Sequence, residues 1–289
     1  MNYSDLILLI EKKNESLFTQ EKPPHSTNLL HQLRKGDESK LEYFNAICKK
    51  YIELRNAAES SISDYHSFVY NLVDAANNYM DCFKENNPFS HQQDFTSSIV
   101  PEFFFLLLSA IVKNLNLDLF VSAQSQVPIE CLFDLHDGGR MMFKTKRLDM
   151  LVAKKTSIRL QDKAYPFIIP VIAMEMKTNL DKNMLAGIEH SVTSLKKTFP
   201  KCSYFVITEL SDMAIDKLNY AASDIDEIYI IRKQKRIEVR RNKNIRKSIS
   251  KDLILDIVIN CVSTLKSNHT SSPSINDRMH NGKLISFNG

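Results

Sequence analysis

Glu175 and Lys177 are the two charged residues of an otherwise apolar stretch, Phe167 to Lys177, with the sequence FIIPVIAMEMK. Its β-branched and aromatic residues are typical of a buried strand. Because alternate side chains of a strand share a face, the glutamate and the lysine point to one side together with Ala173 and Val171. The two methionines of the motif point to the other side. The pattern therefore predicts a carboxylate and an amine on one face, where a buried strand ends.

Asp149 supplies a second carboxylate, on the preceding predicted strand at 143–153. If the two strands pair as a hairpin through a loop at 154–165, Asp149 and Glu175 converge at one edge of the sheet. Two carboxylates and the backbone carbonyl of Met176 form an oxygen-rich site suited to Mg²⁺, which takes few protein ligands and keeps several waters. Carboxylates more than about 8 Å apart could not share one ion, because Mg²⁺ binds oxygen at roughly 2.0–2.1 Å.

Such a site meets the requirements of phosphodiester hydrolysis. A divalent cation lowers the pKa of a bound water and neutralises charge that develops on the phosphate. Lys177 lies within reach of that water or of a phosphate oxygen. The alternative is structural, because Glu175 and Lys177 could simply form the solvent-facing end of a central strand.

The pattern of Asp149, 25 intervening residues and Glu175-Met176-Lys177 resembles the PD-(D/E)xK nuclease motif. The wider stretch MEMKTNLDKNMLAGIEHSVTSL resembles type II restriction endonucleases, in particular the two-subunit enzymes that cut CCTNAGC-type sites. The resemblance covers roughly residues 98–210. It implies an α/β fold with a restriction-endonuclease-like core, in which helices flank a mixed central sheet. One departure is Leu148, which stands where many relatives have proline.

The resemblance also implies a set of site residues. Asp149, Glu175 and the Met176 carbonyl would bind Mg²⁺, and Lys177 would orient or activate the attacking water. In many relatives an acidic residue on a preceding helix joins the metal site. Glu102, in the sequence VPEFFFLLL, is the matching candidate in this chain.

A strongly basic segment lies outside this resemblance, at 232–251. It holds ten lysines and arginines and one acid, a local charge of +9 in a chain whose net charge is +4. The remainder of the chain therefore carries −5, the difference between the two. A basic segment on a mildly acidic body is a candidate contact to a phosphate backbone, although a solvated face has the same composition. The predicted DNA-backbone residues are Lys146, Arg232, Lys233, Lys235, Arg236, Arg240 and Arg241.

The chain divides into three predicted regions. Residues 1–96 form a helical region, in which two prolines predict a linker at 21–27. A helical stripe of apolar residues at 65–83 is expected to pack against either a partner helix or a second subunit. Residues 97–266 form the nuclease core with its basic segment, and 267–289 form a flexible tail.

Within the core, an amphipathic helix at 183–199 separates the motif strand from a second strand, SYFVITEL. A strand, a helix and a further strand predict a βαβ unit with parallel strands. A further helix at 212–222, a strand at 227–232 and a helix at 253–265 follow.

Composition excludes several other classes of protein. The five cysteines are scattered without CxxC spacing, which argues against a disulfide framework or a zinc site and suits a reducing cytoplasm. Neither GxxxxGK[ST] nor GxGxxG occurs, so a nucleotide-binding loop is not expected. The longest apolar run, Phe103 to Val112, is shorter than the roughly 20 residues that cross a bilayer, and predicts a core helix.

Together these features predict a cytoplasmic, Mg²⁺-dependent DNA endonuclease of the type II restriction class. A double-strand cut needs two active sites and this chain offers one, so a homodimer or heterodimer with a second nuclease subunit is expected. Two alternatives remain. One is a structure-specific repair nuclease or a phage-defence nuclease, and the other is a non-catalytic nucleic-acid-binding subunit of the same fold.

Overall fold

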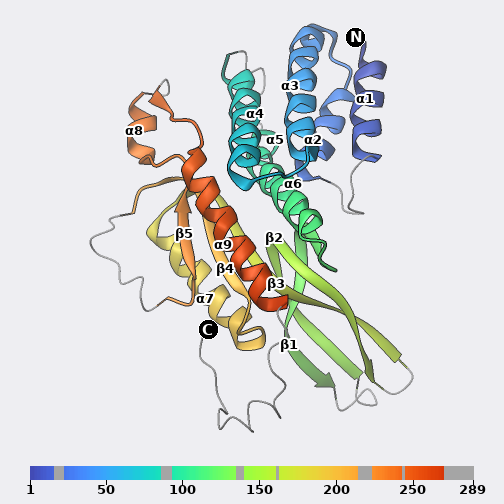
Figure 1. Cartoon of the computed structure of the whole chain (residues 1–289), viewed down its shortest axis with the longest axis vertical. Helices are drawn as coiled ribbons and strands as arrows, with labels where there is room; N and C mark the ends of the chain where they lie inside the picture. Colours follow the sequence, from blue (N-terminus) through green and yellow to red (C-terminus); the bar gives the residue numbers. More distant parts are fainter. Residues whose placement is uncertain are drawn as a thin grey trace.

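The computed structural model of the chain describes residues 1–15, 23–85, 93–134, 140–160, 163–213, 223–242 and 245–269. The first part is helical (Figure 1), with α1 (Tyr3–Glu15), α2 (Pro24–Leu33), the 3-10 helix η1 (Glu38–Lys40), α3 (Leu41–Glu59), α4 (Tyr65–Glu85), α5 (Gln93–Ser97) and α6 (Ile99–Asn114). The second part contains β1 (Phe120–Asp134), β2 (Arg140–Leu160), β3 (Lys163–Leu180), α7 (Lys182–Thr198), β4 (Ser203–Ser211), β5 (Glu227–Ile230), α8 (Arg236–Arg241) and α9 (Lys251–His269).

The described strands form one mixed sheet in the order β1-β2-β3-β4-β5. Strands β1, β2 and β3 run antiparallel, whereas β3, β4 and β5 are parallel. The predicted βαβ unit is confirmed, since α7 connects the parallel strands β3 and β4. This helix begins where the Asp181 carboxylate accepts a hydrogen bond from the Met184 N–H at 2.9 Å.

The sheet separates two apolar clusters. On one face, α7 packs through Leu185, Ile188, Val192 and Leu195 against Leu151, Ala173 and Val206. On the other face, α6 and α9 pack against Met150, Met174, Met176 and Ile207. The predicted alternation holds from Ile172 onward, because Ala173 and Met174 lie in opposite clusters. Val171, expected on the side of Ala173, packs instead with the cluster of Met174, next to the register shift of the β2–β3 ladder between Val152 and Ala153.

The helical region packs against the second face at one end of the molecule, while the far ends of β1, β2 and β3 project from the other (Figure 1). The apolar stripe of α4 is buried within the chain against α3 and α9, so intrachain packing accounts for it and a second subunit is not needed. Helix α6 is buried along almost its whole length. Among the described residues, Phe95–Asn114 is long and apolar enough to span a membrane, but most of this segment is buried in the fold.

Three sequence-based expectations need correction. Most of the loop expected at 154–165 is strand, because β2 and β3 continue their ladder as far as the Leu160–Lys163 pair. Part of the linker expected at 21–27 is helix, because Pro24 starts α2 at a position where proline loses no hydrogen bond. Met184, expected on the buried side of α7, is 43% exposed.

Other expectations fall partly or wholly outside the described residues. The helix expected at 212–222 lies there except for Asp212 and Met213, which are not helical. The tail expected at 267–289 lies there from residue 270 onward, while its first three residues belong to α9.

Candidate active site

The candidate site lies where β2 and β3 stop pairing. Their ladder ends at the Met150–Met174 pair, and the next residues along each strand are Asp149 and Glu175. Beyond this point β3 pairs with β4 on its other side, with Glu175 opposite Val206. A fork between two antiparallel strands therefore presents both carboxylates, as the sequence predicted.

Lys177 joins the two carboxylates. Its Nζ lies 2.7 Å from Glu175 Oε1 and 3.5 Å from Asp149 Oδ2. These two carboxylate oxygens are therefore at most 6.2 Å apart, the sum of the two distances. That separation is below the limit of about 8 Å for carboxylates that share one ion. The three side chains are 13% to 31% exposed, so solvent and a ligand can reach the group.

The electrostatics of the group favour a charged Lys177. Burial of the ammonium lowers the pKa of Lys177, but the hydrogen bond to Glu175 and the charges of both carboxylates outweigh burial. The net effect is a raised pKa. The two carboxylates thus already enclose a positive charge, which is the electrostatic requirement of a cation site.

A backbone contact fixes Asp149 from the β3 side. Its Oδ2 accepts a hydrogen bond from the Met176 N–H at 2.8 Å, in place of a ladder partner on β2. In an antiparallel strand the N–H and C=O of one residue point to the same neighbour. The Met176 carbonyl is therefore expected on the Asp149 side of β3.

Two residues at the site were not found by sequence reasoning. Tyr204 is a buried residue near the start of β4, and its hydroxyl donates to Glu175 Oε2 at 3.3 Å. Burial raises the pKa of Tyr204 far above its usual range. Gln124 Nε2 donates to Asp149 Oδ1 at 3.3 Å from β1. Tyrosine and glutamine are common in strands, so their presence in the sequence does not mark them as site residues. Only the register of the sheet shows that Tyr204 and Gln124 lie beside the carboxylates.

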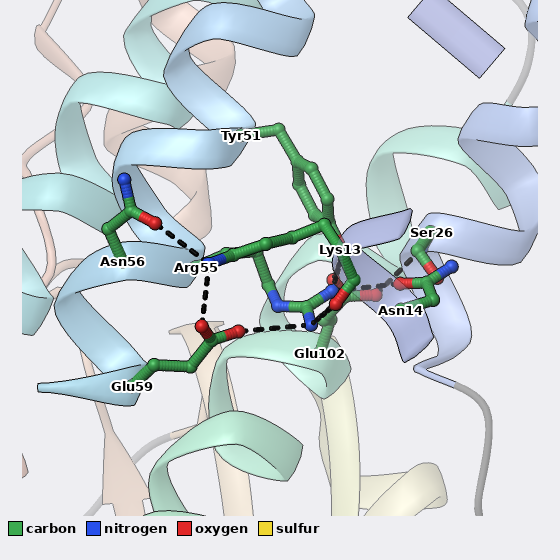
Figure 2. A network of polar contacts seen from close by, with 8 residues as sticks. All are labelled: Lys13, Asn14, Ser26, Tyr51, Arg55, Asn56, Glu59 and Glu102. Atoms are coloured by element: carbon green, nitrogen blue, oxygen red, sulfur yellow. Dashed lines mark hydrogen bonds and ion pairs between the residues drawn. The ribbon is translucent and has the colours of Figure 1, made fainter. Parts of the chain in front are cut away.

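Glu102 lies elsewhere, in a buried polar network of the helical region (Figure 2). Its Oε2 accepts a hydrogen bond from the Ser26 N–H at 2.7 Å, and its Oε1 accepts one from the Tyr51 hydroxyl at 2.5 Å. Arg55 Nη1 donates to the same hydroxyl at 2.9 Å. Burial raises the pKa of Glu102, although the bonds from Tyr51 and Ser26 and the charge of Arg55 oppose the shift.

The position of Glu102 corrects its expected place at the metal site. Helix α6 packs against α2 and α3 at this point, so the carboxylate turns into the helical bundle. Within the described part of the chain, no three His, Cys, Asp or Glu side chains gather as a metal-ligating group. The site therefore offers two carboxylates, Asp149 and Glu175, without a third from α6.

The basic segment is only partly available to a ligand. Arg232 is 3% exposed; its Nε lies 2.7 Å from Glu209 Oε2, and its Nη1 donates to the Lys247 carbonyl at 2.5 Å. Burial lowers the pKa of Arg232. Arg246 binds the same Glu209 oxygen at 2.6 Å. These contacts use Arg232 inside the protein, which corrects its expected role at the DNA backbone.

The other predicted backbone contacts remain near the surface. Lys233, Lys235, Arg240 and Arg241 are exposed on and around α8, and Arg236 is half-buried. Lys146, on β2, is half-buried, and its Nζ donates to Ser191 Oγ of α7 at 3.1 Å.

Two comparisons with known proteins gave matches. The family model described as "Bpu10I restriction endonuclease" matches residues 92–253, which include the whole fork of β2 and β3. A solved structure described as "native BbvCI A2B2 tetramer at low resolution" is similar, with a TM-score of 0.68 and 23% identity over 88% of this chain and 100% of that chain. No curated protein matches. The structural likeness confirms the predicted restriction-endonuclease-like fold, with a mixed sheet between helices.

Proposed function

Because this chain belongs to the Bpu10I restriction endonuclease family, it is a type II restriction endonuclease, and we propose that it cuts double-stranded DNA with Mg²⁺ at the fork of β2 and β3. The observation that carries the proposal is the pair of carboxylates, Asp149 and Glu175, held around one ammonium. The family supports the reaction class, and the fork supports the location within the chain.

The residues of the fork fit a Mg²⁺ ion. Asp149 and Glu175 would hold it, with the Met176 carbonyl as a third oxygen, and this donor set is the hard-oxygen type that Mg²⁺ prefers. When bound, the ion neutralises charge on the phosphate that is attacked. The carboxylates need little reorganisation, since they already surround the charge of Lys177.

Lys177 would act on the phosphate as a cation. The hydrogen bond to Glu175 and the charges of both carboxylates raise the pKa of Lys177, so in the metal-free chain the lysine is a hydrogen-bond donor and a positive charge. A preorganised charge at a shielded site stabilises charge that builds in the transition state. Lys177 would exchange one carboxylate contact for a phosphate oxygen when DNA binds.

Assembly follows from the number of sites. A double-strand cut requires two forks, and this chain supplies one pair of motif carboxylates. We therefore propose that it works with a second nuclease subunit, as a homodimer or a heterodimer. The solved structure that it resembles is described as an A2B2 tetramer, which supports assembly from more than one kind of chain.

The test is cleavage of supercoiled plasmid DNA by the purified chain with Mg²⁺, alone and with a candidate partner subunit. Glu175→Ala and Lys177→Ala are assayed in parallel, with thermal melting as a check of folding. Discrete linear fragments that disappear in both folded variants are the expected result. Nicked plasmid from the chain alone, converted to linear DNA by a partner, would indicate a heterodimer.

Two outcomes would contradict the proposal. Fragments that persist in both variants would mean that the fork is not the active site. Intact plasmid under every condition, with DNA retained by the chain, would instead favour a non-catalytic binding subunit.

A further inference from the structure

Gln124 occupies an unusual backbone position directly opposite Asp149. The ladder between β1 and β2 contains the pairs Ala123–Met150 and Ser125–Leu148, whereas Gln124, which lies between them, forms no ladder pair. Its φ is 60°, in the left-handed region, and its side chain is exposed. The strand thus breaks its regular geometry at the one residue that faces Asp149.

That backbone conformation is unfavourable for glutamine. Left-handed φ is readily adopted by glycine and tolerated by asparagine, whereas other residues are strained there. Such strain persists where the surrounding structure imposes it, and it concentrates at functional sites. The other described positive-φ residues are Asn116 and Lys233, besides Gly36, and neither Asn116 nor Lys233 lies on a strand of the sheet.

The contacts around the break are specific. Gln124 Nε2 donates to Asp149 Oδ1 at 3.3 Å, while the Met176 N–H donates to Oδ2 at 2.8 Å. A carboxylate only accepts hydrogen bonds, so the amide nitrogen is the atom that faces it. Ser122 and Ser125 bond to each other across the break at 2.5 Å, which braces the distorted strand.

We propose that Gln124 is a positioning residue for the reaction at the fork, which orients the Asp149 carboxylate toward Glu175. The inference rests on the proposed function. Two neighbouring strands each hold one oxygen of Asp149, Gln124 from β1 and Met176 from β3. Oδ1 keeps a further lone pair for a cation, and the second lone pair of Oδ2 faces the Lys177 ammonium at 3.5 Å. Partners of this kind fix the orientation of metal-binding carboxylates, and their loss typically costs about 10- to 100-fold in metal affinity or activity.

Two substitutions of Gln124 separate the effect of the backbone strain on stability from the effect of the side-chain amide on metal binding. Gln124→Gly removes both, and Gln124→Ala removes the amide but keeps a side chain at positive φ. Asn116→Gly is the matched control, since Asn116 is exposed, has a φ of 51° and lies in the turn after α6.

Two measurements are made on the full chain without DNA. They are denaturant unfolding without metal and titration with Mg²⁺ by calorimetry. We expect Gln124→Gly to unfold with an equilibrium constant roughly 5- to 30-fold smaller than the wild type. We expect both Gln124 variants to bind Mg²⁺ about tenfold more weakly or worse. Asn116→Gly should keep wild-type affinity for Mg²⁺.

Each possible result bears on the proposal. Wild-type affinity for Mg²⁺ in both Gln124 variants would show that the amide does not position Asp149. A Gln124→Gly protein that is less stable than Gln124→Ala, which also lacks the amide, would show that the backbone is not strained. Failure of the proposed function is a separate result, in which Glu175→Ala binds Mg²⁺ and cleaves plasmid as well as the wild type does.

Discussion

Tyr204 and Lys177 each bind one oxygen of the Glu175 carboxylate. The Tyr204 hydroxyl binds Oε2 from the interior, and the Lys177 ammonium binds Oε1 from the solvent side. Glu175 is therefore fixed in one orientation before any ligand arrives. Orientation of this kind reduces the reorganisation that a catalytic site must undergo during the reaction.

The first prediction at this scale concerns Tyr204→Phe. Phenylalanine fills the same buried volume, so folding should be retained, but one charged hydrogen bond to Glu175 is lost. Because the Tyr204–Glu175 hydrogen bond is long, its contribution lies near the lower end of the range for hydrogen bonds to charged groups, about 1.5 kcal/mol. We expect the Mg²⁺ concentration for half-maximal cleavage to rise about tenfold.

Tyr229→Phe is the matched control for Tyr204→Phe. Tyr229 lies on β5, and its hydroxyl accepts a hydrogen bond from Asn260 of α9 at 2.6 Å, away from the fork. Its removal should leave the Mg²⁺ requirement unchanged. Equal effects of the two substitutions would argue against a role for Tyr204 in holding Glu175.

At the scale of elements, α2 is anchored to α4 and α5 by one buried histidine. His25 Nδ1 lies 3.0 Å from the Phe95 carbonyl, and its Nε2 lies 2.5 Å from the Tyr79 hydroxyl. A carbonyl only accepts, so Nδ1 carries the proton and Nε2 accepts from Tyr79. Burial lowers the pKa of His25 to about 3, which keeps the ring neutral.

The neutral ring makes stability depend on pH. The unfolded chain protonates His25 near its ordinary pKa of about 6.5, whereas the folded chain does so only near 3. The unfolded state therefore binds more protons between these values, and stability is lost as pH falls through this window. The slope contributed by His25 alone is at most about 1.4 kcal/mol per pH unit.

Chemical denaturation of wild type and His25→Gln between pH 7 and pH 4 tests this prediction. The variant is expected to be less stable at neutral pH but to lose less stability on acidification. His190→Gln, at an exposed position on α7, serves as control and should retain the wild-type slope. Parallel curves for His25→Gln and wild type would contradict the assignment of a neutral buried ring.

At the scale of the whole molecule, the basic segment divides into an internal part and an external part. Arg232 and Arg246 neutralise Glu209, and Lys251 pairs with Asp74 at 2.7 Å. These three charges join the segment to the body of the protein. Among the described residues of the segment, the exposed bases around α8 and Lys247 remain available to a phosphate backbone.

The corresponding prediction is a shallower salt dependence when those bases are removed. Replacing Lys233, Lys235 and Arg240 by glutamine should weaken DNA binding to all sequences alike. Each lost phosphate contact should reduce the slope of log K against log salt by about 0.9. Filter binding across salt concentrations measures both quantities.

A variant with three lysines replaced in the helical region, Lys12, Lys35 and Lys49, changes the net charge by the same amount at another part of the surface. It should bind DNA with the wild-type slope. Identical behaviour of the two triple variants would mean that net charge alone, rather than the segment around α8, determines DNA affinity.

The sequence by itself determined several of the elements and the central pair, Glu175 and Lys177, although the length of the β2–β3 hairpin and the start of α2 were wrong. Alternation placed Glu175 and Lys177 on one face, and the helical pattern between two strands predicted α7 and the parallel pairing of β3 and β4. These features are local, because the period of a side-chain pattern follows from the backbone geometry of a single element. The motif residues were also accessible to this reasoning, since they lie on two strands that follow each other along the chain.

Only the tertiary structure decided which distant residues meet. Gln124 and Tyr204 reach the carboxylates through strand register, whereas Glu102 and Arg232 are drawn into buried contacts with Tyr51 and Glu209. The sequence alone does not distinguish a charged side chain that faces solvent from one that contacts a buried partner. Its position depends on desolvation and on the partner that offsets it, and both are properties of the packed molecule.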